Sequence, residues 1–586
     1  MRESSIRELN DSKNLLSWKF ATAILAFLWV PLVTFDFDSH HDGLIMMNVK
    51  LLRDAISNSG EWPFNQYGSF WVFPQALFSM LFPEGFLLLS IRIFTVICYW
   101  ITGYLIWSLG SKFVSRKGAF LAVVLFFGSQ PFIGRFASDL TPWPSAVLMP
   151  VIVGEAIILN FVIGENRRID FKERAALFIA GLIAPVIVLT RAQVGIALLL
   201  SILFFVFLSK GFLGTIWISL GFLFSSTLFF LYLNSQGWLG QSLYDEFVFG
   251  AVYLKHPEVS HLPTPIFTSI GTLSVLVLLN FGPKIILQLR KVFAVKILVS
   301  ILVTLVIVIT STLFFVLHER TLNPLSSFTV FSRRLWMSIF LGALAFEVIK
   351  QIRIILMGKK SGLRKNIVQR KRNALLAISI AGQIQLWPFF DQQHFWWGAV
   401  PGVVIVAIVY IERINFLNYP LLKNQRFQSV VLTFCVIASA IQWVPQVTAS
   451  RSAYPLSFTS GIRINPDASK TDVAVQSFLK RNLLPDTRIL NLCQNPDPFY
   501  TKNYLISASR IFVYWPQMQF ADKYMKSFRD SKPEAIVACS LNEFNPDIQK
   551  QAEVDQMILL AQVAPKKELI EKVILGGKTW QIWKVH

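Results

Sequence analysis

Apolar stretches long enough to cross a membrane follow one another along most of the chain. The first runs from about residue 20 to 35, after a polar N-terminus of mixed charge. The others are centred near residues 95, 127, 152, 182, 202, 223, 274, 307, 343, 381, 403 and 438. Because about 20 apolar residues in a helix cross a bilayer, the pattern predicts an α-helical polytopic membrane protein with about 13 transmembrane helices. No small-residue cleavage site follows the first stretch, so we expect it to remain as a span.

The stretch from 176 to 209 is the weakest part of this pattern. It holds about 34 residues, too many for a single span, and Arg191 stands in its middle. We interpret it as two spans that meet at the outer face.

The pattern changes after residue 449, where hydrophobicity falls and charge becomes ordinary. Buried strands are predicted at 486–492 and 535–539, a helix at 471–482 and a last strand at 580–585. We therefore divide the chain into a transmembrane domain, 1–449, and a small C-terminal α/β domain, 450–586. Within the first domain, residues 36–83 form a long outer loop that carries a juxtamembrane helix over 44–57.

Composition excludes a soluble class, and the charge distribution sets the expected topology. The chain has 586 residues, 54% of them hydrophobic and 15% charged, with a mean hydropathy of +0.53. The net charge of +21 comes mostly from Lys and Arg in segments expected to be cytoplasmic, densest over 359–372, so nucleic acid is not expected as a partner. The charge distribution favours an N-terminus in the cytoplasm. Because an odd number of spans puts the two termini on opposite sides, we expect the C-terminal domain outside the inner (plasma) membrane.

The four cysteines fall into two kinds. Cys98 and Cys435 lie in apolar runs and are expected to pack, whereas Cys493 and Cys539 lie in the C-terminal domain. The second two could form a disulfide if that domain faces an oxidising compartment.

The chemistry is expected around an acidic and histidine-rich stretch, Phe35-Asp36-Phe37-Asp38-Ser39-His40-His41-Asp42-Gly43, directly after the first span. Carboxylates are costly beside hydrocarbon, so such a cluster is a functional candidate. Asp42 stands where it would cap the helix over 44–57, and a capping aspartate would point its carboxylate outward. We favour Asp42 as a general base, with Asp38 as a further acid.

Metal binding is a second reading of the same cluster. Asp38, His40 and His41 could ligate a divalent cation, although hydrogen-bond support of Asp42 is favoured over metal binding and no cofactor is required.

The remaining candidates come from the other outer loops. Asp139 is either a second active-site acid or punctuation before a helix. For the donor phosphate the candidates are Arg191, Arg320, Arg333 and Arg334. For substrate contact they are His41, Trp62, Gln66, Tyr67 and His394. Arg191 could instead make a structural salt bridge, and His394 could belong to an interfacial aromatic belt.

These motifs resemble the GT-C membrane glycosyltransferases. The residues that carry the resemblance are His41-Asp42-Gly43, then Ser59-Gly60-Glu61-Trp62-Pro63 and Asn65-Gln66-Tyr67-Gly68. They are most similar to the branch of protein mannosyltransferases and aminoarabinose transferases and to a related bacterial family of lipopolysaccharide core assembly. Asp42 matches the catalytic aspartate of that pattern, while Gly43 replaces its usual glutamate.

The resemblance implies a glycosyltransferase of the cell envelope. Such an enzyme transfers a hexosyl or pentosyl group from a polyprenyl-phosphate carrier to a hydroxyl of a glycan, lipid or protein, with inversion. The alternatives are a transporter or flippase of lipid-linked glycans, and a membrane glycan polymerase or ligase. We find no paired halves with interrupted helices of the kind that transporters show.

Overall fold

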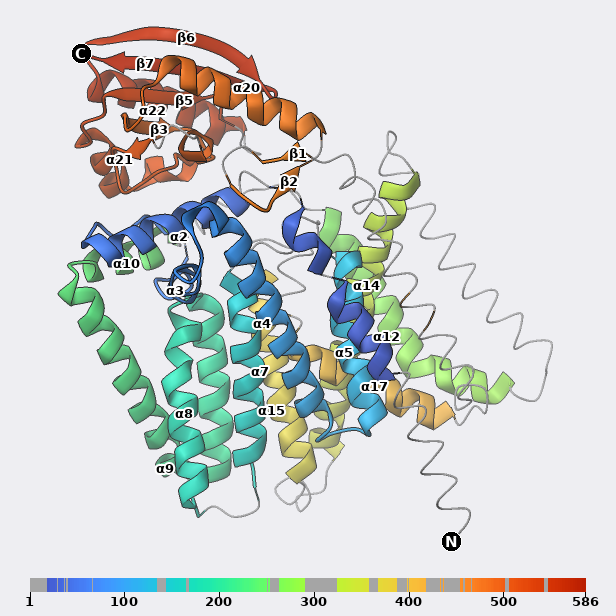
Figure 1. Ribbon diagram of the computed structural model, residues 1–586. Helices are drawn as coiled ribbons and strands as arrows, with labels where there is room; N and C mark the ends of the chain where they lie inside the picture. The colour runs from blue at the N-terminus through green and yellow to red at the C-terminus, as the bar shows by residue number, and fades with distance from the viewer. Residues whose placement is uncertain are drawn as a thin grey trace.

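The computed structural model describes residues 18–28, 30–35, 37, 41–65, 67–133, 144–164, 168–249, 251–252, 263–289, 324–357, 367–386, 398, 400–417, 433, 436, 454–456, 459–464, 466–500, 505–541 and 546–586. Long helices extend across the width of the molecule, and an α/β unit formed by the C-terminal residues lies above one part of them (Figure 1).

Helices lie over the apolar stretches centred near residues 95, 127, 152, 182, 202, 223, 274, 343, 381 and 403, and shorter helices lie between them. After Trp18–Phe27, they are η1 (Val30–Thr34), α2 (His41–Asn58), α3 (Phe73–Ser79), η2 (Glu84–Phe86), α4 (Leu87–Gly110), α5 (Arg116–Ile133), α7 (Pro144–Val162), α8 (Phe171–Val188), α9 (Ala192–Ser235), α10 (Leu239–Tyr244), the π-helical turn η3 (Asp245–Phe249), α12 (Pro263–Leu289), α14 (Pro324–Met357), α15 (Ile367–Gly382), η4 (Gln383–Leu386) and α17 (Gly402–Leu417). By length and apolar composition alone, Glu84–Gly110 and Ala192–Ser235 are long enough to cross a membrane. The stretches near 307 and 438 lie outside the described residues, so the total of about 13 spans stays a prediction.

Two helices, α8 and the start of α9, occupy the stretch 176–209, and their roles as two spans that meet at the outer face stay a prediction. The chain leaves the helical path at Leu189–Arg191, and α9 begins at Ala192. Helix α9 itself is interrupted at Gly211, whose φ of 69° and ψ of −163° are not helical. It therefore consists of two helical segments, which explains how one element holds 44 residues.

Helix α8 packs closely against the second segment of α9. A Cβ atom on Gly181 would lie 2.1 Å from the carbonyl oxygen of Ile218, and one on Gly221 would lie 2.2 Å from that of Phe178. Two glycines thus let the two backbones touch, which is the usual way for helices to approach in an apolar environment.

The C-terminal residues form a mixed five-stranded sheet in the order β4-β3-β5-β7-β6. Its strands are β3 (Arg488–Leu492), β4 (Ile506–Ser507), β5 (Ala535–Cys539), β6 (Lys567–Leu575) and β7 (Lys578–Val585), and a separate pair is β1 (Tyr454–Pro455) with β2 (Arg463–Ile464). Strands β4, β3 and β5 are parallel, and β7 and β6 are antiparallel to their neighbours. The helices are α20 (Pro466–Asn482), η5 (Asp497–Tyr500), η6 (Pro516–Phe520), α21 (Asp522–Arg529) and α22 (Pro546–Val563).

The strands predicted near 486–492, at 535–539 and at 580–585 are confirmed as β3, β5 and β7. A disulfide joins Cys493 to Cys539, just after β3 and at the end of β5, so the pairing left open by the sequence is present. Strand β6 was not expected because it is mostly exposed and lacks an apolar face.

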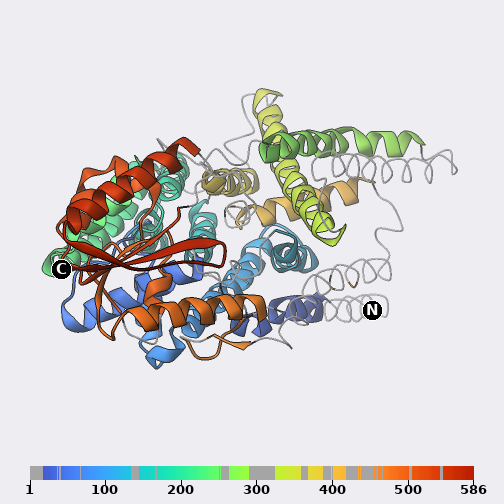
Figure 2. The ribbon, with the colours of Figure 1, turned by 90° about the horizontal axis from the view of Figure 1, so that it is seen from above.

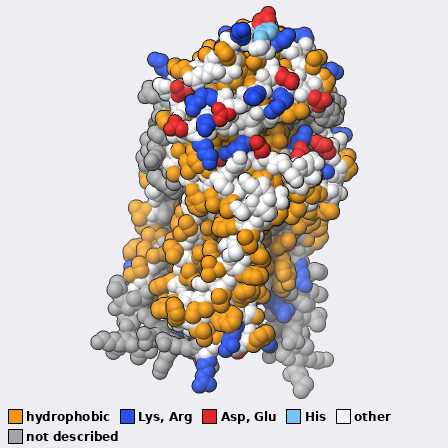
Figure 3. All heavy atoms as spheres, turned by 90° about the vertical axis from the view of Figure 1, so that its left-hand side faces the viewer, with side chains coloured by type: hydrophobic (Ala, Val, Ile, Leu, Met, Phe, Trp, Pro, Cys, Tyr) orange, Lys and Arg blue, Asp and Glu red, His pale blue; other side chains and the backbone are white. Residues whose placement is uncertain are grey.

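The C-terminal sheet covers only part of the bundle. Seen from above, it lies over the region of α2 to α10, to one side of α12 and α14 (Figure 2). A side view shows charged side chains gathered on this C-terminal part and a broad hydrophobic surface on the helices (Figure 3). On the face that this view shows, most charged side chains therefore lie apart from the apolar surface of the helices.

Candidate functional site

Asp42 is paired with an arginine that the sequence analysis did not single out. Its Oδ2 accepts a hydrogen bond from Nη2 of Arg92 at 2.6 Å, and both side chains are 0% exposed. Arg92 lies in the second turn of α4, so its guanidinium reaches from the end of one helix to the start of α2. The ion pair neutralises a carboxylate that would otherwise be buried alone.

The same guanidinium also holds the chain that precedes Asp42. Nη1 of Arg92 donates to the carbonyl oxygens of Phe35 at 2.8 Å and of Val33 at 3.4 Å. Arg92 therefore connects the end of the first apolar stretch to the start of α2. This fixes the two ends of the acidic stretch, whose Asp38 and His40 lie outside the described residues.

The expected capping role of Asp42 is wrong in two respects. Helix α2 begins at His41, so Asp42 lies in its first turn rather than at the cap, and its carboxylate is enclosed instead of pointing outward. Helix α2 is also more covered than a helix on a membrane surface would be, since every residue from Asp42 to Val49 is buried. The α/β unit lies above this helix (Figure 1), which accounts for part of the cover.

A second centre is built by the loop between α2 and α3, residues 59–72, which carries Trp62, Gln66 and Tyr67. Asn65 organises it: its Oδ1 accepts from the Tyr67 amide at 3.0 Å and from the Trp71 indole at 2.6 Å. Its Nδ2 donates to the carbonyl oxygen of Gly68 at 2.9 Å. One buried amide side chain thus sets the path of the loop.

This loop packs on the turn between α8 and α9, so two motifs that the sequence keeps apart come together. The amide of Gly68 donates to the carbonyl oxygen of Thr190 at 3.1 Å, and that of Phe70 to Leu189 at 2.9 Å. The guanidinium of Arg191 lies over the ring of Tyr67, 5.7 Å from its centre. Arg191 is only 8% exposed, and the contact is a cation–π interaction.

Two adjacent carboxylates, Asp245 and Glu246, face the same loop and were missed by the sequence analysis. Oδ2 of Asp245 accepts a hydrogen bond from the backbone N–H of Asn65 at 3.4 Å, and Oε2 of Glu246 accepts one from the backbone N–H of Ser69 at 3.3 Å. Both are buried, at 0% and 7% exposure. The sequence feature that could have identified them is a pair of adjacent acidic residues between apolar residues in the expected outer loop 235–265.

Glu246 is the more unusual of the two. Its Oε1 is buried and has no hydrogen-bond partner among the described residues. Burial raises the pKa of its carboxyl to about 7, and the Ser69 hydrogen bonds offset only part of this rise. Burial raises the pKa of Asp245 as well, but hydrogen bonds from Arg510, Tyr524 and Asn65 oppose it.

Arg510 and Tyr524 bring the C-terminal unit into this centre. The two guanidinium nitrogens of Arg510 donate to Asp245, Nη1 to Oδ2 at 2.7 Å and Nη2 to Oδ1 at 2.9 Å. The Tyr524 hydroxyl donates to Oδ1 of Asp245 at 3.1 Å. A bidentate, nearly enclosed pair of this kind is strong and directional.

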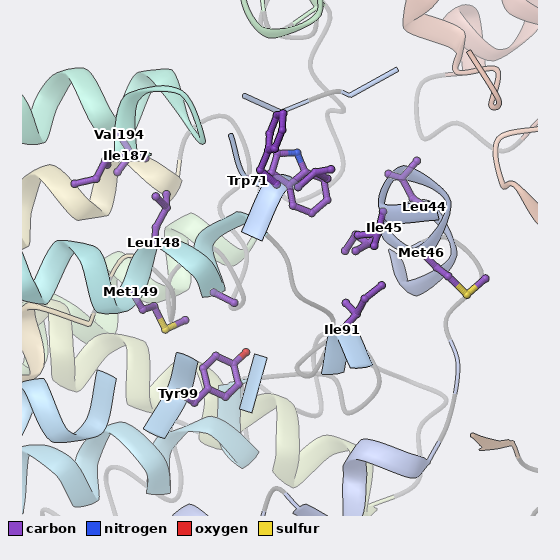
Figure 4. Close-up of a cluster of buried hydrophobic side chains, with 14 of the residues drawn as sticks. Leu44, Ile45, Met46, Trp71, Ile91, Tyr99, Leu148, Met149, Ile187 and Val194 are labelled. Carbon is purple, nitrogen blue, oxygen red and sulfur yellow. The ribbon is translucent and has the colours of Figure 1, made fainter. Parts of the chain in front are cut away.

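Trp62 lies in an aromatic cluster rather than at an open surface. It is 0% exposed, and its ring packs against those of Phe73 and Trp238, at 5.9 and 5.7 Å between centres. Below the loop, buried side chains from α2, α4, α7, α8 and α9 fill the interior around Trp71 (Figure 4). A role of Trp62 in substrate contact stays a prediction.

The other predicted site residues are not described. Six of them lie outside the described residues: Asp38, His40, Gln66, Asp139, Arg320 and His394. For Arg333 and Arg334, which lie in α14, the structure describes the backbone only. Within the described part of the chain, no group of three or more His, Cys, Asp or Glu side chains could hold a metal ion.

Comparison with known proteins gives distant structural similarities. No protein-family model matches the chain, and no curated protein matches it. The oligosaccharyltransferase of Archaeoglobus fulgidus, tethered to an acceptor peptide with an NVT sequon, is similar with a TM-score of 0.47 and 12% identity, over 90% of this chain and 69% of that one. The same archaeal enzyme, AglB, with an inhibitory peptide and a dolichol-phosphate, gives 0.46 and 12%, over the same shares.

A similarity of more complete coverage is to ArnT from Cupriavidus metallidurans bound to undecaprenyl phosphate. Its TM-score is 0.40 at 13% identity, over 96% of this chain and 97% of that one.

Proposed function

We propose that this chain is an integral membrane glycosyltransferase that moves a sugar from a polyprenyl-phosphate-linked donor to an acceptor hydroxyl, with inversion. The observation that supports it best is the enclosed pair of Asp42 and Arg92. Burying two charges costs several kcal/mol per ion by a rough estimate, so such a pair is a poor way to gain stability. Its place at the start of α2, directly after the first apolar stretch, favours a chemical role.

The proposed reaction uses Asp42 as the general base. The acceptor oxygen forms a bond to the anomeric carbon while the bond from that carbon to the phosphate oxygen breaks. The acceptor proton passes to Asp42, and the electron pair leaves with the lipid phosphate. Because the carboxylate is 0% exposed, neighbouring side chains must move when the acceptor binds.

Arg191 is the proposed partner of the donor phosphate. It stands at the turn between α8 and α9 and lies over the Tyr67 ring, which leaves its guanidinium held in place by the protein. A fixed positive charge stabilises a leaving phosphate without reorganisation during the reaction. Arg333 and Arg334 of α14 and Arg320 remain further candidates for the same role.

We place this chemistry on the outer face of the inner membrane, with the N-terminus in the cytoplasm. The Cys493–Cys539 disulfide supports an oxidising compartment for the C-terminal unit. The concentration of Lys and Arg over 359–372 supports the cytoplasm for the opposite side.

The test compares sugar transfer by purified wild type and Asp42→Asn from a panel of polyprenyl-phosphate donors. We expect a loss of about a hundredfold or more in kcat for the variant, with donor binding retained. Asp54→Asn is the matched control, because Asp54 is an exposed aspartate on the same helix, and we expect it to transfer at the wild-type rate.

Two results would contradict this assignment. Equal transfer by wild type and Asp42→Asn removes Asp42 as the base and moves the role to Asp38 or Asp139. If the wild type transfers no sugar to an acceptor but moves lipid-linked sugar from one leaflet of a vesicle membrane to the other, the flippase alternative is favoured.

A further inference from the structure

The carboxylate of Asp245 joins three parts of the chain that are far apart in sequence. It binds the Arg510 guanidinium through both oxygens and the Tyr524 hydroxyl through one. It also accepts from the Asn65 amide in the loop between α2 and α3. One side chain thus links the outer loop after α9, the C-terminal unit and the loop of Tyr67.

Arg510 contacts that loop a second time through its own backbone. The carbonyl oxygen of Arg510 accepts from the Phe64 amide at 3.0 Å. The Phe64 ring packs edge-on against the rings of Trp515 and Tyr524, at 5.7 and 5.5 Å between centres. Phe64 is therefore held by main-chain and aromatic contacts from the C-terminal segment, and Asn65 is held by Asp245, to which Arg510 binds.

The effect of these contacts continues to Tyr67. The backbone N–H of Asn65 donates to Asp245, and the side-chain oxygen of Asn65 accepts a hydrogen bond from the backbone N–H of Tyr67. Tyr67 in turn lies under the Arg191 guanidinium. A continuous set of contacts thus runs from Arg510 through Asp245 and Asn65 to the proposed phosphate site.

We propose that Arg510 is a positioning residue that holds Tyr67 under Arg191 through Asp245 and Asn65, so that the C-terminal unit completes the donor-binding site. This proposal rests on the proposed function for the identity of the donor. Breaking the Asp245–Arg510 pair frees the loop and weakens donor binding, while the residues that carry the chemistry remain in place. The alternative is that the pair only fastens the C-terminal unit to the bundle.

The first measurement is binding of undecaprenyl phosphate to full-length protein in detergent. We expect Arg510→Gln and Asp245→Asn to weaken binding about tenfold. Arg510→Lys keeps the charge but loses the bidentate geometry, and we expect it to recover part of the affinity. Arg481→Gln removes a different ion pair, the partly exposed one between Arg481 of α20 and Glu571 of β6, and we expect a change of less than about twofold.

The second measurement does not depend on any ligand. Amide hydrogen exchange of the segment 60–71 reports directly on the Phe64, Asn65 and Tyr67 amides. We expect faster exchange there in Arg510→Gln and Asp245→Asn, while exchange of β6 and β7 stays as in wild type. Unchanged β6 and β7 also show that the C-terminal sheet of each variant remains folded.

The two measurements separate the inference from the proposed function. Faster exchange over 60–71 with weaker lipid binding supports the proposal, and unchanged exchange overturns it. Faster exchange with unchanged lipid binding shows that the Asp245–Arg510 pair only attaches the C-terminal unit to the bundle, and this result also overturns the proposal. If wild type itself binds no undecaprenyl phosphate, the proposed donor class fails, and exchange alone decides whether Arg510 positions Tyr67.

Discussion

At the scale of single residues, Gly68 is where the site tolerates the least change. A Cβ atom there would lie 1.9 Å from the backbone oxygen of Leu189, which cannot move without shifting the turn that carries Arg191. We predict that Gly68→Ala destabilises the protein by about 1–3 kcal/mol, seen as a lower Tm. Gly240→Ala is the control, since a Cβ atom at Gly240 meets nothing within 4 Å. An equal Tm for both variants would contradict the close contact.

Glu246 should make stability depend on pH. Burial raises the pKa of its carboxyl from 4.5 to about 7, so between these values the folded protein keeps a proton that the unfolded chain has lost. Stability therefore falls as pH rises from about 4.5 to 7, by up to about 3 kcal/mol, and stays lowered above pH 7. Glu246→Gln remains neutral and removes this loss.

We predict that the Tm of Glu246→Gln, relative to wild type, increases as pH is raised from 5 to 8. Thermal unfolding in detergent at several pH values measures it. Asp467→Asn, on the exposed face of α20, serves as the control and should show no such trend. A constant difference between Glu246→Gln and wild type would show that the Glu246 carboxyl is not buried as described.

Residue-level prediction singled out side chains that are unusual in their local sequence. Asp42 stands out because it follows an apolar run, and Arg191 because it interrupts one. Arg92 offered the same signal, a charge within an apolar stretch, but its partner lies 50 residues away and only folding joins them. Asp245 is separated from Arg510 by 265 residues, a distance over which no local pattern carries information.

At the scale of elements, α9 is divided by backbone geometry rather than by packing. Gly211 has a φ of 69° and a ψ of −163°, a conformation that is open almost only to glycine. A Cβ atom there would meet nothing within 4 Å. The glycine is therefore required by the turn itself and not by a neighbour.

We predict that Gly211→Ala costs about 1–3 kcal/mol even though the site is open. Gly282→Ala is the matched control, because a Cβ atom on this glycine of α12 also meets nothing within 4 Å, and its backbone φ is not positive. The comparison of their Tm values isolates backbone strain. If both variants unfold at the wild-type temperature, α9 does not bend at Gly211.

Elements with a regular apolar pattern were predicted well, and those without one were not. The strands β3 and β5 are apolar and almost wholly buried, so their short runs could be recognised. Strand β6 has charged and apolar residues on both faces and no buried residue, so it gave no such signal. The helix predicted over 471–482 begins at Pro466 in the structure. Its first turn was missed because that turn has few apolar residues and is partly exposed.

At the scale of the whole molecule, the separation of charged and apolar surfaces predicts a topology. We expect a protease added to intact spheroplasts to reach the C-terminal unit and a tag placed after His586, while a tag before Met1 stays protected. Detergent permeabilisation is the control that exposes both. Protection of the C-terminal tag in intact spheroplasts would place the site on the cytoplasmic side and exclude the proposed outer-face reaction.

The bond between Asp245 and Arg510 also orders events during synthesis of the chain. At about 5–20 residues per second, Arg510 is made roughly 13–50 s after Asp245, because 265 positions separate them. Throughout that interval the Asp245 carboxylate lacks the Arg510 guanidinium and the Tyr524 hydroxyl, and the Tyr67 loop lacks its outer support. A late segment of the chain thus completes a loop made much earlier, and a chain that ends before residue 510 would have its helices without a finished site.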